Sequence, residues 1–151
     1  FQGARVVVGH IGDSRLYRLR GGHLVRITRD DSLPQEPLGA GLVTPQQAAV
    51  SVHRNLVTRA MGVDEAVLLE VAEHRVEPGD CYLLCSDGLS DMVDDASIAT
   101  LMAADVSPDA RARLLVDAAN ARGGRDNISV LLAQASGTPA KRGLMSRLLG
   151  A

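Results

Sequence analysis

The chain has 151 residues, a length typical of one domain and sufficient to bury roughly 68–70% of the unfolded surface. With one Phe, two Tyr and no Trp, its core must be built from aliphatic side chains. The net charge of −2 and the scarcity of aromatic side chains argue against nucleic-acid binding. No run of ~18 apolar residues and no signal peptide is visible. Cys81 and Cys85 are interpreted as two reduced thiols of a cytosolic protein.

The N-terminal part of the sequence has the alternating and β-branched residues of antiparallel strands. Strands are expected at residues 4–9, 14–20 and 23–28. The pair Gly21-Gly22 is a two-residue hairpin signal between the second and the third strand. Residues 29–43 are rich in Pro and Gly and are expected to form a loop.

The middle of the chain is expected to contain a helix followed by two strands. The segment TPQQ at 44–47 has the pattern of a capping box with Pro at the first helical position, which predicts a helix over about residues 45–53. Residues 66–76 favour a strand, with a short helix as the alternative. After a turn at 78–80, the apolar segment 81–86 is expected to be a buried strand.

The C-terminal part is expected to be helical before a last strand. One helix should begin near Asp94 or Asp95, and a longer one should cover residues 107–123, between a Ser-Pro cap and a terminal Gly. The last strand is expected at 128–134. Residues 136–151 have the composition of a linker and a short cationic amphipathic tail, for which a frayed terminus is favoured over membrane contact or continuation into a further segment. Because strands and helices do not alternate strictly, the α+β class is expected.

Three aspartates stand where predicted strands begin or end. Asp13 follows an apolar strand, Asp87 follows the buried strand, and Asp126 precedes the last strand. Strand ends on one rim of a sheet bring such residues together, although they are far apart in the sequence. Taken singly, Asp-Gly and Asp-Asn pairs are ordinary turn formers, and Asp91 is explained equally well as a cap of the next helix.

Clustered carboxylates without Cys or His partners favour a hard divalent cation. Because carboxylates repel each other, a cation between them stabilises the cluster. Mg²⁺ and Mn²⁺ keep water in their coordination shell, and a water between two ions about 3.5–4 Å apart is a nucleophile for phosphoryl transfer. The residues alone therefore indicate an α+β domain with an acidic metal site. A Ca²⁺-binding structural domain is disfavoured because no EF-hand loop pattern occurs.

Four stretches of the chain share the pattern of one family. They are VGHIGDSRLYRLRGGHLVRITRDDS at 8–32, RNLVTRAMG at 54–62, EPGDCYLLCSDGLSDMVDD at 77–95 and GGRDNISVLLAQ at 123–134. In this order they resemble the GDSR, N-x-x-T-R-A-x-G, SDGL-x-D and GG-x-DN motifs of the metal-dependent Ser/Thr protein phosphatases of type 2C (PPM family), in their bacterial form. The resemblance covers about residues 4–135.

This resemblance implies an αββα sandwich, in which two antiparallel sheets are flanked by helices, and a phosphatase that hydrolyses phosphoserine and phosphothreonine. It implies that Asp87 and Asp126 are ligands of a dinuclear Mn²⁺ or Mg²⁺ centre whose bridging water attacks the phosphate. Asp13, with Asp87 and Asp91, would hold a third, weaker ion. The resemblance implies no catalytic residue beyond the metal ligands, and the substrate-binding residues stay unassigned.

Parts of the family pattern are missing. The chain has no D-G-x-G-G loop, whose Asp bridges both ions, and Asp31 stands where the family usually has His. Residues 1–135 are therefore expected to be the C-terminal portion of the phosphatase domain, without its first strands and first helix, and 136–151 a linker and tail. On its own, such a chain is expected to bind metal poorly and to show little turnover.

Two functions from different classes follow. The first is a phosphatase that acts on phosphorylated proteins in the cytoplasm or at the cytoplasmic face of a membrane, with a Ser/Thr kinase as the expected partner. The alternative is a non-catalytic phosphatase-like module that binds a partner or regulates a kinase. Retention of Asp13, Asp87 and Asp126 argues for the enzyme. A D-G-x-G-G motif encoded in frame upstream of Phe1 would support the enzyme, and a start codon just before Phe1 would support the module.

Overall fold

A computed structural model describes residues 1–30 and 69–136 of the chain. The α+β class expected from the sequence is confirmed, since strands and helices both occur in these ranges and the strands are antiparallel. The strands are β1 (Arg5–His10), β2 (Arg15–Arg20), β3 (His23–Arg26), β4 (Glu70–Arg75), β5 (Cys81–Cys85) and β6 (Val130–Gln134). The helices are α3 (Asp87–Ser90), α4 (Asp95–Met102) and α5 (Pro108–Ala121).

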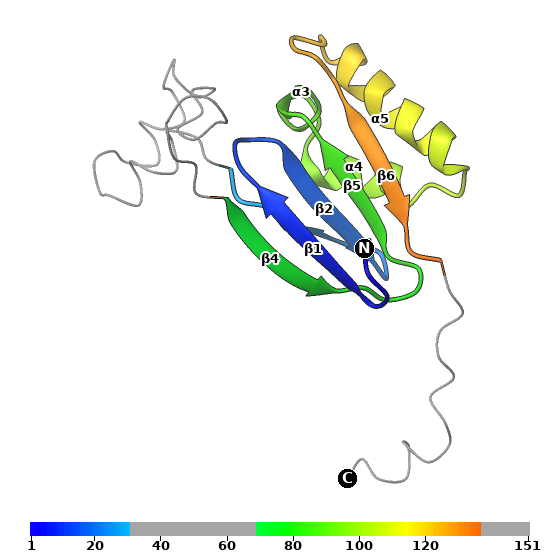
Figure 1. Cartoon of the computed structure of the whole chain (residues 1–151). Coiled ribbons are helices and arrows are strands. Elements are labelled where there is room, and N and C mark those ends of the chain that lie inside the picture. The colour runs from blue at the N-terminus through cyan, green and yellow to red at the C-terminus, as the bar shows by residue number, and fades with distance from the viewer. Residues whose placement is uncertain (31–68, 137–151) are drawn as a thin grey trace, which may run out of the picture.

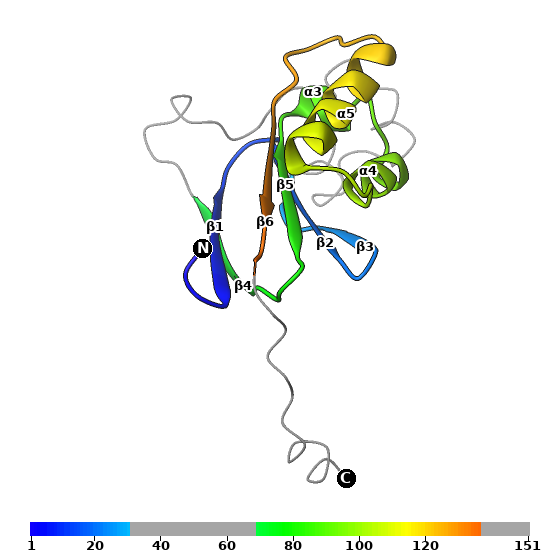
Figure 2. The same cartoon turned by 90° about the vertical axis from the view of Figure 1, so that its right-hand side faces the viewer.

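The strands form two antiparallel sheets. β1 pairs with β4 in a two-stranded sheet, and the four-stranded sheet has the order β3-β2-β5-β6. Figure 1 shows the strands with the helices behind them, and Figure 2 shows the two sheets as separate layers, with α4 and α5 on the outer side of the larger one. The described residues therefore stack as small sheet, large sheet and helices.

Two apolar clusters hold these layers together. The larger cluster lies between the four-stranded sheet and the helices, and the smaller one lies between the two sheets. Alternation along β5 explains this division, because successive side chains of a strand point to opposite faces. Leu83 belongs to the helix-side cluster, whereas Tyr82 belongs to the cluster with Val6 and Leu16. Each face of the large sheet thus packs against a different layer.

Most predicted elements in the described ranges are confirmed, with ends that differ by one or two residues. The segment predicted at 66–76 forms a strand over Glu70–Arg75, so the helical alternative is wrong there. Asp94 caps α4 by accepting a hydrogen bond from the Ser97 amide at 2.8 Å. The predicted helix at 45–53 and all but the first residue of the predicted linker and tail lie outside the described residues.

α3 was not predicted from the sequence. It is a single turn directly after β5, where the sequence indicated only an acid-rich stretch. Leu89 in this turn is completely buried, so a tertiary contact fixes the helical conformation. Within residues 1–30 and 69–136, no helix is long and apolar enough to cross a membrane.

Candidate metal site

Strand register brings the predicted aspartates to one rim of the four-stranded sheet. Arg15 at the start of β2 is paired with Cys85 at the end of β5, and Cys85 is paired with Val130 at the start of β6. The aspartates stand within a few residues of these strand ends: Asp13, Asp87 and Asp126. Their backbone positions therefore converge, as expected from the sequence.

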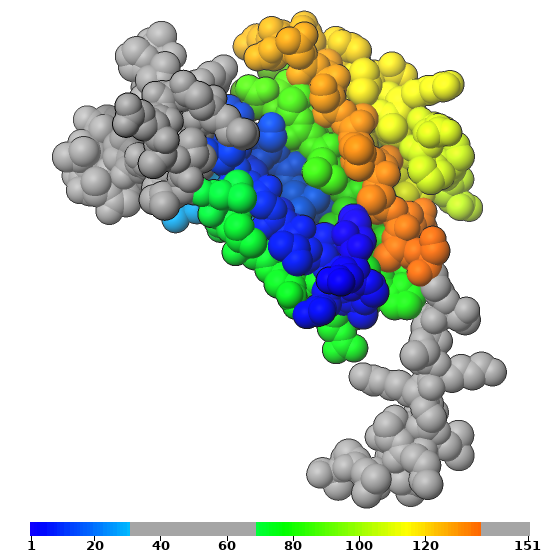
Figure 3. Space-filling view, in the orientation of Figure 1, coloured from blue at the N-terminus to red at the C-terminus, as the bar shows by residue number. Residues whose placement is uncertain are grey.

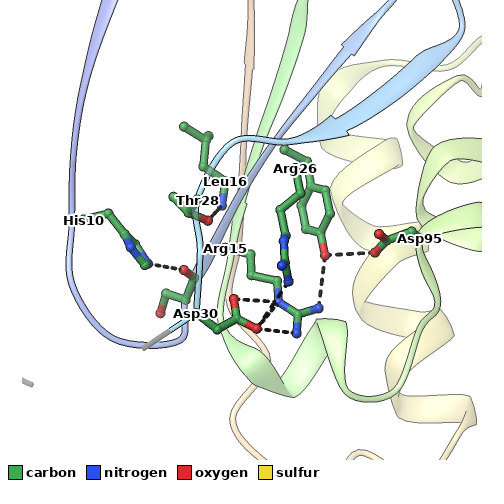
Figure 4. Close-up of polar contacts among 9 residues, drawn as sticks. His10, Arg15, Leu16, Arg26, Thr28, Asp30 and Asp95 are labelled. Atoms are coloured by element: carbon green, nitrogen blue, oxygen red, sulfur yellow. Dashed lines mark hydrogen bonds and ion pairs between the residues drawn. The ribbon is translucent and has the colours of Figure 1, made fainter. Parts of the chain in front are cut away.

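The loop between β1 and β2 holds Asp13 next to this rim. Gly12 has a φ of 97°, in the left-handed region that favours glycine, so the chain can turn sharply after β1. His10 closes the loop by donating from Nε2 to the Ser14 carbonyl oxygen at 2.7 Å (Figure 4). Asp13 is half-buried between these two anchors. Its carboxylate is consequently carried by a constrained segment.

Asp87 opens the single turn of α3. Ser86 before it is extended, with φ −73° and ψ 166°, and Leu89 anchors the turn in the larger core. The Asp87 carboxylate accepts a hydrogen bond from the Gly88 amide at 2.8 Å. The Asp91 amide donates to the Asp87 carbonyl oxygen, also at 2.8 Å. The turn thus fixes Asp87 at its start and Asp91 at its end.

The segment that carries Asp126 lies directly against this turn. Ser86 Oγ donates to the Asn127 carbonyl oxygen at 2.8 Å, which joins the end of β5 to the chain before β6. Gly88 leaves room for the approach, because a Cβ atom there would stand 2.4 Å from the Asn127 carbonyl oxygen. Asp87 and Asp126 are therefore on adjacent segments.

The carboxylates at the rim also influence one another electrostatically. Burial raises the pKa of Asp13 above its usual range, and the negative charge of Asp87 raises it further. The charges of Asp30 and Asp91 act in the same direction more weakly. The charges of Asp87 and Asp91 thus repel that of Asp13 across this rim, and a divalent cation would relieve that repulsion.

The predicted ligands match a hard divalent cation in their chemistry, because all four are carboxylates. Among the residues that the structure describes, no three His, Cys, Asp or Glu side chains are grouped closely enough to hold an ion by themselves. The chain thus brings Asp87 and Asp126 onto adjacent segments and Asp13 close enough to feel the charges of Asp87 and Asp91, but the described residues do not form a group of three ligands.

A second group of charged residues near the rim has no counterpart in the sequence-based prediction. Arg15 Nε donates to both carboxylate oxygens of Asp30 at 3.1 Å, and Nη2 donates to Oδ2 at 2.7 Å (Figure 4). Arg26 Nη1 donates to the same Oδ2 at 3.3 Å. Asp30 is only 7% exposed, although the sequence places it in a predicted loop. The sequence does contain a signal for this ion pair, because Arg15 and Arg26 lie on two predicted strands that precede Asp30. Such a pattern does not show whether an ion pair is buried or exposed to solvent.

The cysteines do not have the properties of nucleophiles. Cys81 and Cys85 are both free and buried, in agreement with the reduced thiols expected. Burial raises the pKa of Cys85 to about 11, so its thiol keeps its proton near neutral pH. The geometry therefore favours chemistry at the carboxylate rim over covalent catalysis by a thiolate.

Comparison with known proteins agrees with the motifs and the fold. No family model matches the chain. The chain is 42% identical over 135 residues to the serine/threonine protein phosphatase PstP of Mycobacterium tuberculosis, an alignment that covers 88% of this chain and 26% of PstP. The alignments with this and other curated relatives cover between 26% and 52% of the relatives' own length. The chain thus spans about half the length of these relatives, or less.

Solved structures give the same result in three dimensions. The serine/threonine phosphatase of S. agalactiae aligns with a TM-score of 0.85 and 34% identity, over 90% of this chain and 56% of that one. The catalytic domain of PstP in complex with two manganese ions aligns with a TM-score of 0.71 and 37% identity, over 91% of this chain and 56% of that one. Fold and sequence therefore point to the same group of proteins.

Proposed function

Since the chain belongs to the metal-dependent Ser/Thr protein phosphatases of type 2C, we propose that it contributes to an enzyme that hydrolyses phosphoserine and phosphothreonine in proteins. One observation carries the proposal, namely the close approach of the Asn127 peptide to Gly88 in the turn that Asp87 opens. This approach supports a joint role for Asp87 and Asp126, which the sequence separates widely.

In this proposal, Asp87 and Asp126 are ligands of a dinuclear Mn²⁺ or Mg²⁺ centre. Asp13, with Asp87 and Asp91, holds a third and weaker ion. Bound ions of this kind activate a water molecule and neutralise charge on the phosphoryl oxygens. The chain's own contribution is to fix its carboxylates: α3 fixes Asp87, the β1–β2 loop fixes Asp13, and the contact at Gly88 fixes the segment of Asp126. The relative solved with two manganese ions supports the choice of ion.

The proposal extends to the organisation and the surroundings of the chain. Residues 1–135 are assigned to the C-terminal portion of the phosphatase domain, and residues 136–151 to a linker and tail. Phosphorylated proteins are the proposed substrates, and a Ser/Thr kinase is the proposed functional partner. The free thiols of Cys81 and Cys85 support action in the cytoplasm.

A manganese titration of the 151-residue chain tests the metal assignment. Asp87→Asn and Asp126→Asn should each weaken Mn²⁺ binding by about 10-fold or more, because each replaces a charged oxygen ligand by a neutral amide. Free Mn²⁺ is followed by electron paramagnetic resonance. Affinities equal to that of the unchanged chain in both variants would contradict the assignment.

Asp105→Asn is a matched control for this titration. Asp105 is exposed, and its neighbour Ala104 accepts a hydrogen bond from Arg111, which also reaches Cys81 at the opposite end of β5 from the rim. The control should therefore leave Mn²⁺ binding unchanged. Turnover of a phosphopeptide by the chain alone is expected to be slow, because the D-G-x-G-G ligand is absent from it. Rates like those of full-length relatives would contradict this account of the ligands.

A further inference from the structure

Asp30 lies at the rim but is not used by the proposed metal site. Its charge acts on Asp13, so the two carboxylates are near each other. Its oxygens, however, accept three hydrogen bonds from Arg15 and one from Arg26. A carboxylate engaged in this way is poorly suited to bind a metal ion and well suited to hold an arginine in a fixed orientation.

Arg15 connects the segments that carry the acids. It follows Asp13 by two positions in the sequence. Its Nη1 donates to the Tyr17 hydroxyl at 3.2 Å, and that hydroxyl donates to Asp95 Oδ1 at 3.0 Å (Figure 4). Burial raises the pKa of Tyr17 to about 12, so the hydroxyl keeps the proton that it donates. Asp95 begins α4, the helix that follows the turn of Asp87. The contacts thus run from the start of β2, directly after the β1–β2 loop, to the start of α4, the helix after α3.

This path of contacts is buried at Tyr17 and Asp30 and reaches the surface at Asp95, which is exposed. Tyr17 is 0% exposed, and the side chains of Arg15 and Asp30 are 20% and 8% exposed. A buried ion pair contributes little net stability compared with apolar residues of similar volume, because both charges lose their hydration. Fixing one arrangement of the chain is a better-attested role for such a pair than stabilisation.

We propose that Arg15 is a positioning residue for the metal site, whose contacts with Asp30 and Tyr17 hold the β1–β2 loop in place relative to the turn of Asp87. The inference rests on the proposed function, because it presupposes that Asp13 and Asp87 serve one site. Arg15 is a cation and is not itself a ligand. Its replacement should therefore weaken metal binding without removing any ligand oxygen.

The opposite end of β2 offers a matched control. Arg20 Nε and Nη2 each donate to Asp80 at 2.7 Å, so this pair has the same two-pronged geometry as the pair of Arg15 and Asp30. The side chains of Arg20 and Asp80 are 30% and 0% exposed. Arg15→Met and Arg20→Met thus remove similar ion pairs from the same strand, and only the first lies at the acidic rim.

Circular dichroism first shows whether the two variants fold. Electron paramagnetic resonance then measures the Mn²⁺ affinity of each variant and of the unchanged chain. Arg15→Met is expected to weaken Mn²⁺ binding by about 10- to 100-fold, the range found for residues that orient metal ligands. Arg20→Met is expected to bind Mn²⁺ like the unchanged chain. Unchanged affinity in Arg15→Met, or an equal loss in both variants, overturns the inference. If Arg15→Met does not fold, Arg15→Lys takes its place with the same expectations, since Lys keeps the charge without the planar fork.

A second measurement does not depend on metal. In ¹⁵N relaxation experiments on the metal-free chain, Arg15→Met is expected to lower the order parameters of the Gly12 and Asp13 amides, and Arg20→Met is not. Unchanged order parameters in Arg15→Met overturn the inference. If the unchanged chain binds no Mn²⁺, the assignment of Asp87 and Asp126 as ligands is contradicted, and the order parameters still decide whether Arg15 positions the loop.

Discussion

Gly88 shows how one residue can determine whether two segments meet. It lies inside α3 and is not among the glycines with positive φ in the described part of the chain, so its backbone conformation does not require glycine. Ala is ordinarily favoured over Gly in a helix by about 1 kcal/mol. The reason for glycine here is steric, because an added Cβ would lie 2.4 Å from the Asn127 carbonyl oxygen.

Gly88→Ala is therefore expected to lower the free energy of unfolding by about 1–3 kcal/mol, the usual effect of overpacking, and to weaken Mn²⁺ binding. The added methyl group would displace the Asn127 peptide and, with it, the segment of Asp126. Urea unfolding and the Mn²⁺ titration measure the two effects. Gly9→Ala is the control, because the atoms nearest to its Cβ would belong to a side chain, that of Leu69, at 3.3 Å, and not to the backbone. A Gly88→Ala protein with greater stability and unchanged binding would contradict this steric argument.

At the scale of elements, the turn between β4 and β5 depends on one buried carboxylate. Asp80 accepts hydrogen bonds from Arg20, from the Glu77 amide at 2.8 Å and from the Tyr82 hydroxyl at 3.3 Å. Burial alone would raise the pKa of Asp80, but the hydrogen bonds from Arg20 and the Glu77 amide outweigh it and hold the pKa below its usual range. The ionised carboxylate thus ties β2 to the turn before β5.

Asp80→Asn is expected to lower the free energy of unfolding by about 2–3 kcal/mol near pH 7, because Arg20 loses its charged partner. The folded pKa of Asp80 lies below the unfolded value, so its stabilisation is present above about pH 4 and is lost as the pH falls through the folded pKa. The unchanged protein should therefore lose more stability than Asp80→Asn between about pH 5 and pH 2. Urea unfolding across this interval tests the difference, and parallel pH dependences would argue against it.

The elements that were predicted correctly carry local signals. β2 and β5 have apolar residues at strand spacing, and the N-caps Asp94 and Ser107 mark the starts of α4 and α5. α3 has only one turn, which is too short to show helical periodicity and too short to be stable without the burial of Leu89. Its helical conformation therefore depends on packing that the local sequence does not encode.

The same distinction applies to the candidate site. Asp13, Asp87 and Asp126 were predicted to form a site because each stands at a strand end, and antiparallel register brings the three strand ends together. The pair of Arg15 and Asp30 was not recognised, because the burial that makes it strong arises only when the layers pack. Sequence patterns thus located the acids but not the contacts that hold them.

At the scale of the whole molecule, the two faces of the large sheet are covered unequally. Register aligns Leu16, Leu84 and Leu131 across three neighbouring strands, on the face toward the small sheet. Leu16 is 6% exposed, whereas Leu84 and Leu131 are 44% and 57% exposed. In Figure 3, green atoms of β5 stay visible between the blue β1 and the orange β6. The two-stranded sheet therefore covers β2 but leaves apolar side chains of β5 and β6 open.

This open face is expected to make the 151-residue chain self-associate and bind an apolar dye, because large contiguous apolar patches promote contact between molecules. The double variant Leu84→Thr with Leu131→Thr should reduce both dye fluorescence and the concentration-dependent rise of the sedimentation coefficient, since Thr suits a strand but is polar. Val106→Thr is the control, because Val106 is 43% exposed in the connection between α4 and α5. The expectation would be contradicted if the unchanged chain were monomeric and bound no dye. If self-association and dye binding decrease in the double variant but not in the control, the contact surface lies on β5 and β6.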